Sequence, residues 1–169
     1  LSANDQGAAK NIIGDLIMSQ NGTQETAINE LVMNSVDAGA TLIEIVIDDN
    51  YFSVSDNGKG FTCKEEISRV FKMFGQPHEE GDAEFGRFRI GRGQVMSFGV
   101  ATWHSNEFKM VTDIANKGYQ FKLIENGEDV YPGCHVFVQR YKTSEMRYNS
   151  YYLEEKIKEM VKYLSVSVT

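Results

Sequence analysis

Residues 30–41 read ELVMNSVDAGAT, and they form the second half of the helix around which we expect the fold to be built. Thr23 or Asn21 can cap this helix at its start, and the run 25–38 contains no glycine or proline. Gly39 stands where a helix commonly ends in a left-handed residue. Small and apolar side chains recur at helical spacing along one side. The pattern predicts a helix that ends at Gly39 and lays this side on a sheet.

Three polar side chains of the same helix, Glu30, Asn34 and Asp37, are spaced four and then three residues apart. This spacing places them on one face, so a carboxylate, an amide and a second carboxylate project together. The same stripe is also typical of the solvated side of an amphipathic helix. The helix alone leaves both interpretations open.

The chain that follows predicts a β-hairpin that ends in a glycine-rich turn. Residues 41–48 (TLIEIVID) and 51–55 (YFSVS) alternate and are rich in β-branched side chains. The second strand runs directly into 56–60, DNGKG. Gly58 and Gly60 allow backbone angles closed to other residues and leave no side chain between the chain and a ligand. Such a turn, about twenty residues after the polar stripe, favours a nucleotide site over a plain hairpin.

A stretch rich in glycine and arginine, 86–99 (GRFRIGRGQVMSFG), is the candidate for binding phosphate. Its glycines keep the backbone accessible, and a helix from Gln94 onward would point its first amide groups at an anion. Interleaved arginines in a chain of net charge −7 favour an anion site over a tight turn with surface arginines. The residues expected at the phosphates are Arg89, Gly91, Arg92, Gly93 and Gln94.

Taken in order, the three motifs resemble the GHKL ATPases, the superfamily of DNA gyrase B, the heat-shock chaperone ATPases, the histidine kinases and MutL. The sequence ELVMNSVDAGAT is most similar to the MutL and MORC members. The resemblance covers roughly residues 23–138. It implies a two-layer α/β (α+β) sandwich of the Bergerat type, a mostly antiparallel mixed sheet with helices on one face, which binds ATP and Mg²⁺.

The resemblance also implies a role for each residue of the site. Glu30 would orient and deprotonate the attacking water, and Asn34 would be a neutral oxygen ligand for Mg²⁺. Asp37 would hold a water near this base or cap local backbone groups. Asp56 offers only hydrogen-bond acceptors, which suit the exocyclic amine of adenine and repel the carbonyl of guanine. The other residues expected at the nucleotide are Gly58, Gly60 and Cys134.

Two positions depart from the commonest pattern of these ATPases. Arg89 stands where chaperone and gyrase relatives often have glycine, so the amides that contact phosphate are not assigned. Gly133-Cys134 stands where relatives usually have Gly-Thr before the last strand. A thiol is a poor hydrogen-bond partner, so we expect weaker nucleotide affinity or base selectivity.

Two other functions stay open beside a slow, Mg-dependent ATPase. One is a nucleotide-sensing module, in which ATP closes a lid and alters a protein interface without hydrolysis. The other is the catalytic domain of a histidine kinase. It is disfavoured because no helix with a phosphoacceptor histidine precedes the motifs, and because kinases usually lack a glutamate at the position of Glu30.

The rest of the chain predicts further elements. Thr62 and Glu65 have the spacing of a capping box, so a helix is expected to about residue 75. Strands are expected at 107–114, 118–124 and 135–139, and a closing amphipathic helix around Ile157.

Composition limits the protein class. The length of 169 residues fits one domain. An excess of 24 acidic over 17 basic residues argues against a chain that wraps nucleic acid, so DNA would be contacted through other domains. Cys63 and Cys134 form no disulfide framework and have no metal-type spacing, which indicates a reducing compartment. No membrane span or signal peptide is evident, so we expect a cytoplasmic protein, or a nuclear one in a eukaryote.

Three segments are expected to act outside the central sheet. Residues 1–20 would form an arm that either covers the core or exchanges between the protomers of an ATP-dependent homodimer. Residues 76–93 would form the ATP lid and the phosphate loop, since their first half has the composition of a surface loop. Residues 164–169 alternate like a strand and would open the next domain of a longer protein.

Overall fold

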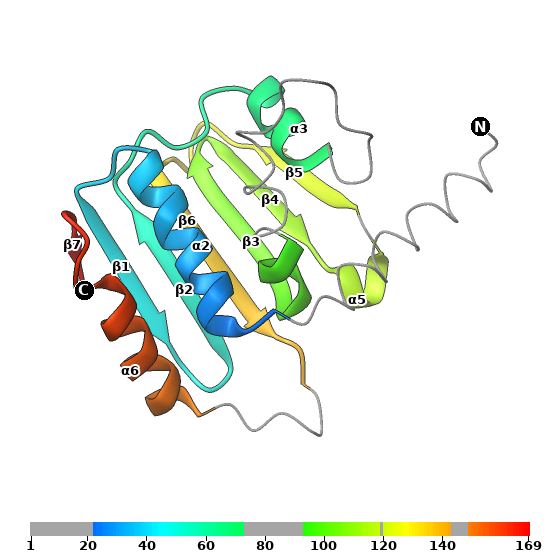
Figure 1. The fold of residues 1–169 in the computed structure, drawn as a ribbon. Helices are drawn as coiled ribbons and strands as arrows, with labels where there is room; N and C mark the ends of the chain where they lie inside the picture. Colours follow the sequence, from blue (N-terminus) through cyan, green and yellow to red (C-terminus); the bar gives the residue numbers. More distant parts are fainter. Residues whose placement is uncertain (1–21, 73–92, 119, 143–148) are drawn as a thin grey trace, which may run out of the picture.

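A computed structural model describes residues 22–72, 93–118, 120–142 and 149–169 (Figure 1). In this part of the chain one seven-stranded sheet has the order β5-β4-β3-β6-β2-β1-β7. All neighbouring strands are antiparallel except β1 and β7, which are parallel. Helices α2, α3 and α6 lie over one face of this sheet (Figure 1). The predicted two-layer α/β sandwich is confirmed.

The strands are β1 (Leu42–Ile47), β2 (Tyr51–Asp56), β3 (Gly99–Asn106), β4 (Phe108–Thr112), β5 (Phe121–Glu125), β6 (Tyr131–Arg140) and β7 (Ser167–Val168). The helices are α2 (Gln24–Asp37), α3 (Lys64–Lys72), α5 (Ile114–Lys117) and α6 (Ser150–Val161). Residues 93–97 are also helical.

Helix α2 begins and ends as its sequence predicts. The Thr23 hydroxyl accepts a hydrogen bond from the Thr26 amide at 3.2 Å, which caps the first turn. After α2, Gly39 takes a positive φ of 76°, where a residue with a Cβ would be strained. The buried side of α2 faces the sheet and consists of Ala27, Ile28, Leu31, Val32 and Ser35, with Gln24 in its first turn.

The core lies between the sheet and the helices. The inward side chains alternate along each strand, as a sheet with one covered face requires. They include Ile43, Phe52, Val54, Ala101, Trp103, Met110, Val136 and Val138. Leu153 and Ile157 of α6 are buried and join the same cluster. The core therefore packs α2 across the middle of the sheet (Figure 1).

Strand β3 was not predicted, and the neighbouring strand bounds differ from those expected. β3 alternates in burial throughout, but its inward side chains include Gly99, Ala101 and Ser105, which give almost no hydrophobic signal. The strands expected at 107–114 and 118–124 are shorter, because α5 occupies 114–117 and Gly118 ends it with a φ of 65°.

The cap of α3 involves a different glutamate from the one predicted. The Thr62 amide and hydroxyl both donate to Glu66 Oε2, at 3.1 and 3.2 Å. Helix α3 begins at Lys64, one residue later than the capping box implied, and Glu66 is then its third residue. A side chain at this third position is the one that reaches back over the helix start.

The expected strand at the end of the chain is present as β7. Its Ser167 and Val168 pair with Leu42 and Ile43 of β1, so β7 extends the sheet of this domain. That it also opens a following domain stays a prediction. The arm 1–20 and most of the lid segment 76–93 lie outside the described residues. No helix in the described ranges is both long and apolar enough to cross a membrane.

Candidate functional site

Asp56 ends β2 with its side chain directed at α2. Its Oδ2 accepts a hydrogen bond from the Ser35 hydroxyl at 2.8 Å, and its Oδ1 accepts one from the Gly58 amide at 2.8 Å. The carboxylate is only 8% exposed. Ser35 follows Asn34 in α2, so this bond brings the helix with the polar stripe together with the glycine-rich turn. The two motifs recognised in the sequence meet at one place.

The turn after Asp56 is tied to the connection between α2 and β1. The Asn57 Oδ1 accepts from the amides of Thr41 and Leu42, at 2.9 and 3.0 Å, and its Nδ2 donates to the Thr41 Oγ1 at 2.9 Å. The Lys59 amide donates to the Ala38 carbonyl at 3.1 Å. These hydrogen bonds therefore hold the turn against the segment that connects the end of α2 to β1.

The last residues of β3 hold the other side of this turn. The Ser105 hydroxyl donates to the Gly133 carbonyl at 2.7 Å and accepts from the Phe61 amide at 2.8 Å. The Asn106 Nδ2 donates to the carbonyls of Lys59 and Phe61, at 3.1 and 2.7 Å. Asn106 itself has a φ of 50°, a conformation that asparagine tolerates better than most residues. The turn 57–61 is thus fixed by β3, β6 and α2 together.

The glycines of the turn allow backbone segments to approach one another. A Cβ on Gly60 would lie 2.4 Å from the Gly133 carbonyl oxygen, and one on Gly133 would lie 2.0 Å from the Asp56 carbonyl oxygen. Both residues have positive φ, 62° and 99°. A Cβ on Gly58 would meet Ala38 at 2.9 Å. At these positions glycine is required by packing within the protein, a reason that the sequence pattern did not reveal.

Cys134 lies beside Asp56 in the neighbouring strand β6. It is paired with Asp56 of β2 on one side and with Ser105 of β3 on the other. Directly opposed residues of antiparallel strands project to the same face of a sheet. The half-buried Cys134 therefore shares the α2 side of the sheet with the Asp56 carboxylate.

The polar stripe lies along α2 next to this turn. Glu30 and Asn34 are half-buried, and Asp37, the last residue of the helix, is exposed. Half-burial of two polar side chains on a helix that covers the sheet places them at the border of the core. A bound ligand and water could both reach them there.

The phosphate candidates are located only in part. Gly93 is buried and Gln94 half-buried, both in the helical segment 93–97, as expected for a helix from Gln94 onward. The Gln94 side chain packs against Gly22, where an added Cβ would lie 2.8 Å from its Cδ. This brings the segment to the start of α2, the helix of Glu30. Arg89, Gly91 and Arg92 lie outside the described residues.

Residues 22–129 match the family described as histidine kinase-, DNA gyrase B-, and HSP90-like ATPase. The chain belongs to this ATPase family. The matched residues begin just before the cap of α2 and include the polar stripe, the glycine-rich turn and the phosphate candidates. No curated protein matches the chain.

The Asp56 carboxylate has room for further hydrogen-bond donors. An ionised carboxylate can accept about four hydrogen bonds, and Ser35 and Gly58 supply two to Asp56. Asp56 therefore retains capacity to accept from an amine. The described residues contain no group of three His, Cys, Asp or Glu side chains that could hold a metal.

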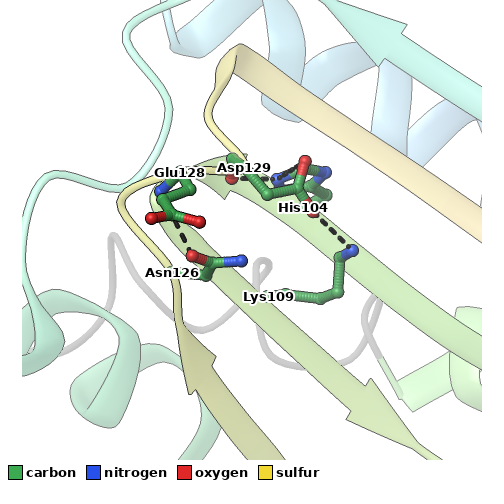
Figure 2. Close-up of polar contacts among 5 residues, drawn as sticks. All are labelled: His104, Lys109, Asn126, Glu128 and Asp129. Carbon is green, nitrogen blue, oxygen red and sulfur yellow. Dashed lines mark hydrogen bonds and ion pairs between the residues drawn. The ribbon is translucent and has the colours of Figure 1, made fainter.

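A polar cluster on the opposite face of the sheet anchors the connection between β5 and β6 (Figure 2). The His104 Nε2 lies 3.0 Å from the Asp129 carbonyl oxygen, and the Lys109 Nζ is 3.1 Å from the Asp129 Oδ2. The hydrogen bond from Lys109 lowers the pKa of Asp129. This connection leads into β6, the strand that also carries Gly133 and Cys134.

His135 also lies on this opposite face, paired with His104 across the strands. Burial lowers the pKa of His135, and the nearby His104 charge lowers it further. The Tyr131 ring lies 5.7 Å from the His104 ring and 5.6 Å from the His135 ring. His135 is adjacent in sequence to Cys134, and the two side chains project to opposite faces of the sheet.

The sequence alone does not reveal the side chains that build the site rather than face a ligand. These are Ser35, Asn57, Ser105 and Asn106, each bonded to a partner 15 or more residues away in sequence. Ser35 and Asn57 lie inside the two motifs 30–41 and 56–60, so their place in these motifs could have marked them as site residues. Nothing local marks Ser105 or Asn106.

Proposed function

We propose that this domain binds ATP with Mg²⁺ and hydrolyses it slowly, as the N-terminal ATPase domain of a larger protein of the MutL or MORC kind. One observation carries the proposal: the Ser35–Asp56 hydrogen bond joins the helix of Glu30 and Asn34 to the glycine-rich turn. Membership of the ATPase family supports it. The similarity to MutL and MORC rests on the residues 30–41.

Asp56 would select the base. Its free acceptor capacity suits the exocyclic amine of adenine, whereas guanine presents a carbonyl at the same position. Gly58, Gly60 and Cys134 would surround the adenine end of the site, and Gly93 and Gln94 would lie toward the phosphates together with Arg89, Gly91 and Arg92.

Glu30 would act on water and Asn34 on the ion. Asn34 lies one turn after Glu30 on α2, and both are half-buried. When bound, Mg²⁺ would neutralise charge on the phosphates. Glu30 would accept the proton of the attacking water, since a general base must lie within hydrogen-bond reach of its target or one water away. Asp37 would hold a further water near this base.

Two segments outside the central sheet would respond to bound ATP. Residues 76–93 would close over bound ATP, and the arm 1–20 would contribute to an ATP-dependent homodimer. DNA, in repair, chromatin or defence, would be contacted through other domains, because the domain itself carries a net charge of −7. Residues 164–169 would lead to the next domain of the larger protein.

Nucleotide binding is tested by the thermal midpoint with Mg-ATP, with Mg-GTP and without ligand. Ligand at about a hundred times its dissociation constant adds roughly 2.7 kcal/mol of stability, which raises the midpoint of such a domain by several degrees. We expect this shift with ATP alone and its loss in Asp56→Asn. Asp49→Asn, an exposed change in the β1–β2 turn, is the matched control and should keep the shift. Absence of a shift at millimolar ATP in the unaltered domain would refute ATP binding by this domain.

Hydrolysis is tested separately by phosphate release from Glu30→Ala. Loss of turnover with ATP binding retained is the expected result, whereas the control Glu44→Ala, exposed on β1, should leave turnover unchanged. An equal, negligible rate in the unaltered protein and in Glu30→Ala would favour the nucleotide-sensing module. Phosphate transfer to a histidine of a partner protein would favour the kinase.

A further inference from the structure

Ser35 has one hydroxyl proton and two acceptors within reach. Its Oγ lies 3.0 Å from the Leu31 carbonyl oxygen, one turn earlier in α2, and 2.8 Å from the Asp56 Oδ2. The side chain is buried, with 3% of its surface exposed. A serine in a helix commonly donates to the carbonyl four residues before it, with no further consequence. Here the second acceptor is closer and ionised, and charge-assisted hydrogen bonds are roughly twice as strong as neutral ones.

The two bonds to the Asp56 carboxylate come from different elements and reach different oxygens. Ser35 donates from α2 to Oδ2, and Gly58 donates from the turn to Oδ1. Rotation of the carboxylate about its Cβ–Cγ bond would break this arrangement. The plane of the carboxylate is therefore set by Ser35 and Gly58 jointly.

The orientation of a carboxylate decides which base it can accept. Adenine offers a single exocyclic amine, which one oxygen lone pair can receive. Guanine offers two adjacent donors, its ring N–H and its amino group, and a freely turning carboxylate can accept both at once through its two oxygens, as it does from arginine.

We infer that Ser35 is a specificity-determining positioning residue, whose hydroxyl holds Asp56 in an orientation that receives adenine and cannot turn to accept the paired donors of guanine. This inference rests on the proposed nucleotide-binding function. Its counterpart, the Gly58 amide, belongs to the backbone, and only a proline, which also fixes φ, would remove it. Ser35 is therefore the part of the arrangement that a mutation can test.

The experiment measures the dissociation constants of Mg-ATP and Mg-GTP by calorimetry for the unaltered domain, Ser35→Ala and Ser53→Ala. Ser53 is equally a buried serine, 5% exposed, but it is on β2 three residues before Asp56 and projects to the other face. In Ser35→Ala we expect ATP to bind about tenfold more weakly, because the Asp56 carboxylate would then hold the orientation that receives adenine only about a tenth of the time. The dissociation constant of Mg-GTP should not increase. The ratio of the GTP to the ATP dissociation constant, which measures the preference for ATP, should therefore decrease. Ser53→Ala should keep the preference of the unaltered domain.

Ser35→Cys provides a second variant, because a thiol has nearly the same size and donates weakly. Its preference should lie between those of the unaltered domain and Ser35→Ala, and it carries the test if Ser35→Ala does not fold. Equal losses of ATP and GTP binding in the Ser35 variants, or no loss, would overturn the inference and leave the proposed function standing. Failure of the unaltered domain to bind either nucleotide would overturn both.

Discussion

Asn57 binds Thr41 through both ends of its side-chain amide. Its Oδ1 accepts from the Thr41 N–H and its Nδ2 donates to the Thr41 Oγ1, each at 2.9 Å. The pair closes a loop of the chain that contains the whole β1–β2 hairpin. Asn57 therefore sets where β1 begins relative to the residue that ends β2.

Replacement of Asn57 tests this closure. We expect Asn57→Ala to lower the free energy of unfolding by about 1–2 kcal/mol, because three hydrogen bonds are lost but the freed amides are exposed enough to bind water. Urea denaturation measures the change. Asn116→Ala, which removes one exposed contact with Asp113, should change stability by no more than about 0.5 kcal/mol. Equal effects of the two substitutions would mean that Asn57 has no special structural role.

Gly133 and Gly127 should respond oppositely to alanine. Gly133→Ala places a Cβ 2.0 Å from the Asp56 carbonyl oxygen at a φ of 99°, so we expect a loss of about 3 kcal/mol or more, or an insoluble product. Gly127→Ala meets nothing within 4 Å. It should be neutral or stabilise the domain by a few tenths of a kcal/mol, because alanine restricts the unfolded chain. Thermal midpoints measure both, and a well-folded Gly133→Ala domain would show that β2 and β6 can separate.

His135 makes stability depend on pH in the mildly acidic range. Burial lowers its pKa in the folded protein, so the unfolded chain binds the proton more readily. The stability that neutral His135 contributes is complete above the unfolded pKa of about 6.5 and is lost as pH falls through the lower folded value. The thermal midpoint should therefore fall between pH 7 and 5, and fall less in His135→Gln. Parallel curves for the two proteins would exclude His135 as the source.

Tyr141 should dominate the alkaline behaviour of the domain. Burial raises its pKa to about 12, and its hydroxyl lies 3.1 Å from the Asp113 Oδ1. Above pH 10 the unfolded chain loses this proton first, so stability should decline from pH 10 toward 12. Ultraviolet titration should show a late step that is lost in Tyr141→Phe. Tyr163→Phe, at a side chain that is 86% exposed, should leave the late step in place.

The elements around the site could be predicted from sequence because their signals are local. Helix α2 has a capping Thr23 and a terminal Gly39, and the hairpin after it alternates through β-branched residues. Strand β3 lacks such a signal, since three of its four inward positions are the small residues Gly99, Ala101 and Ser105. Tertiary packing, rather than local preference, decides that this segment is a strand.

The site itself could be predicted only as a set of residues that face a ligand. Asp56 and Cys134 are 78 positions apart, and their pairing follows from the register of β2 and β6, which no spacing rule reveals. Ser105 and Asn106 support the turn through contacts with residues 28 to 47 positions away. Such contacts exist only once the sheet is assembled. At the cap of α3, Glu66 takes the position predicted for Glu65 because the helix begins one residue later than predicted.

The hydrogen bonds to the turn 57–61 have a thermodynamic consequence. Its composition, with two glycines in five residues, is that of a chain with high conformational entropy. In the folded domain its backbone is already immobilised by Ser105, Asn106 and the Ala38 carbonyl. A ligand that docks against it would lose little entropy in ordering this wall, since that loss was incurred during folding. The favourable enthalpy of the contacts between the ligand and this turn should therefore be offset little by entropy, and should contribute almost fully to the affinity.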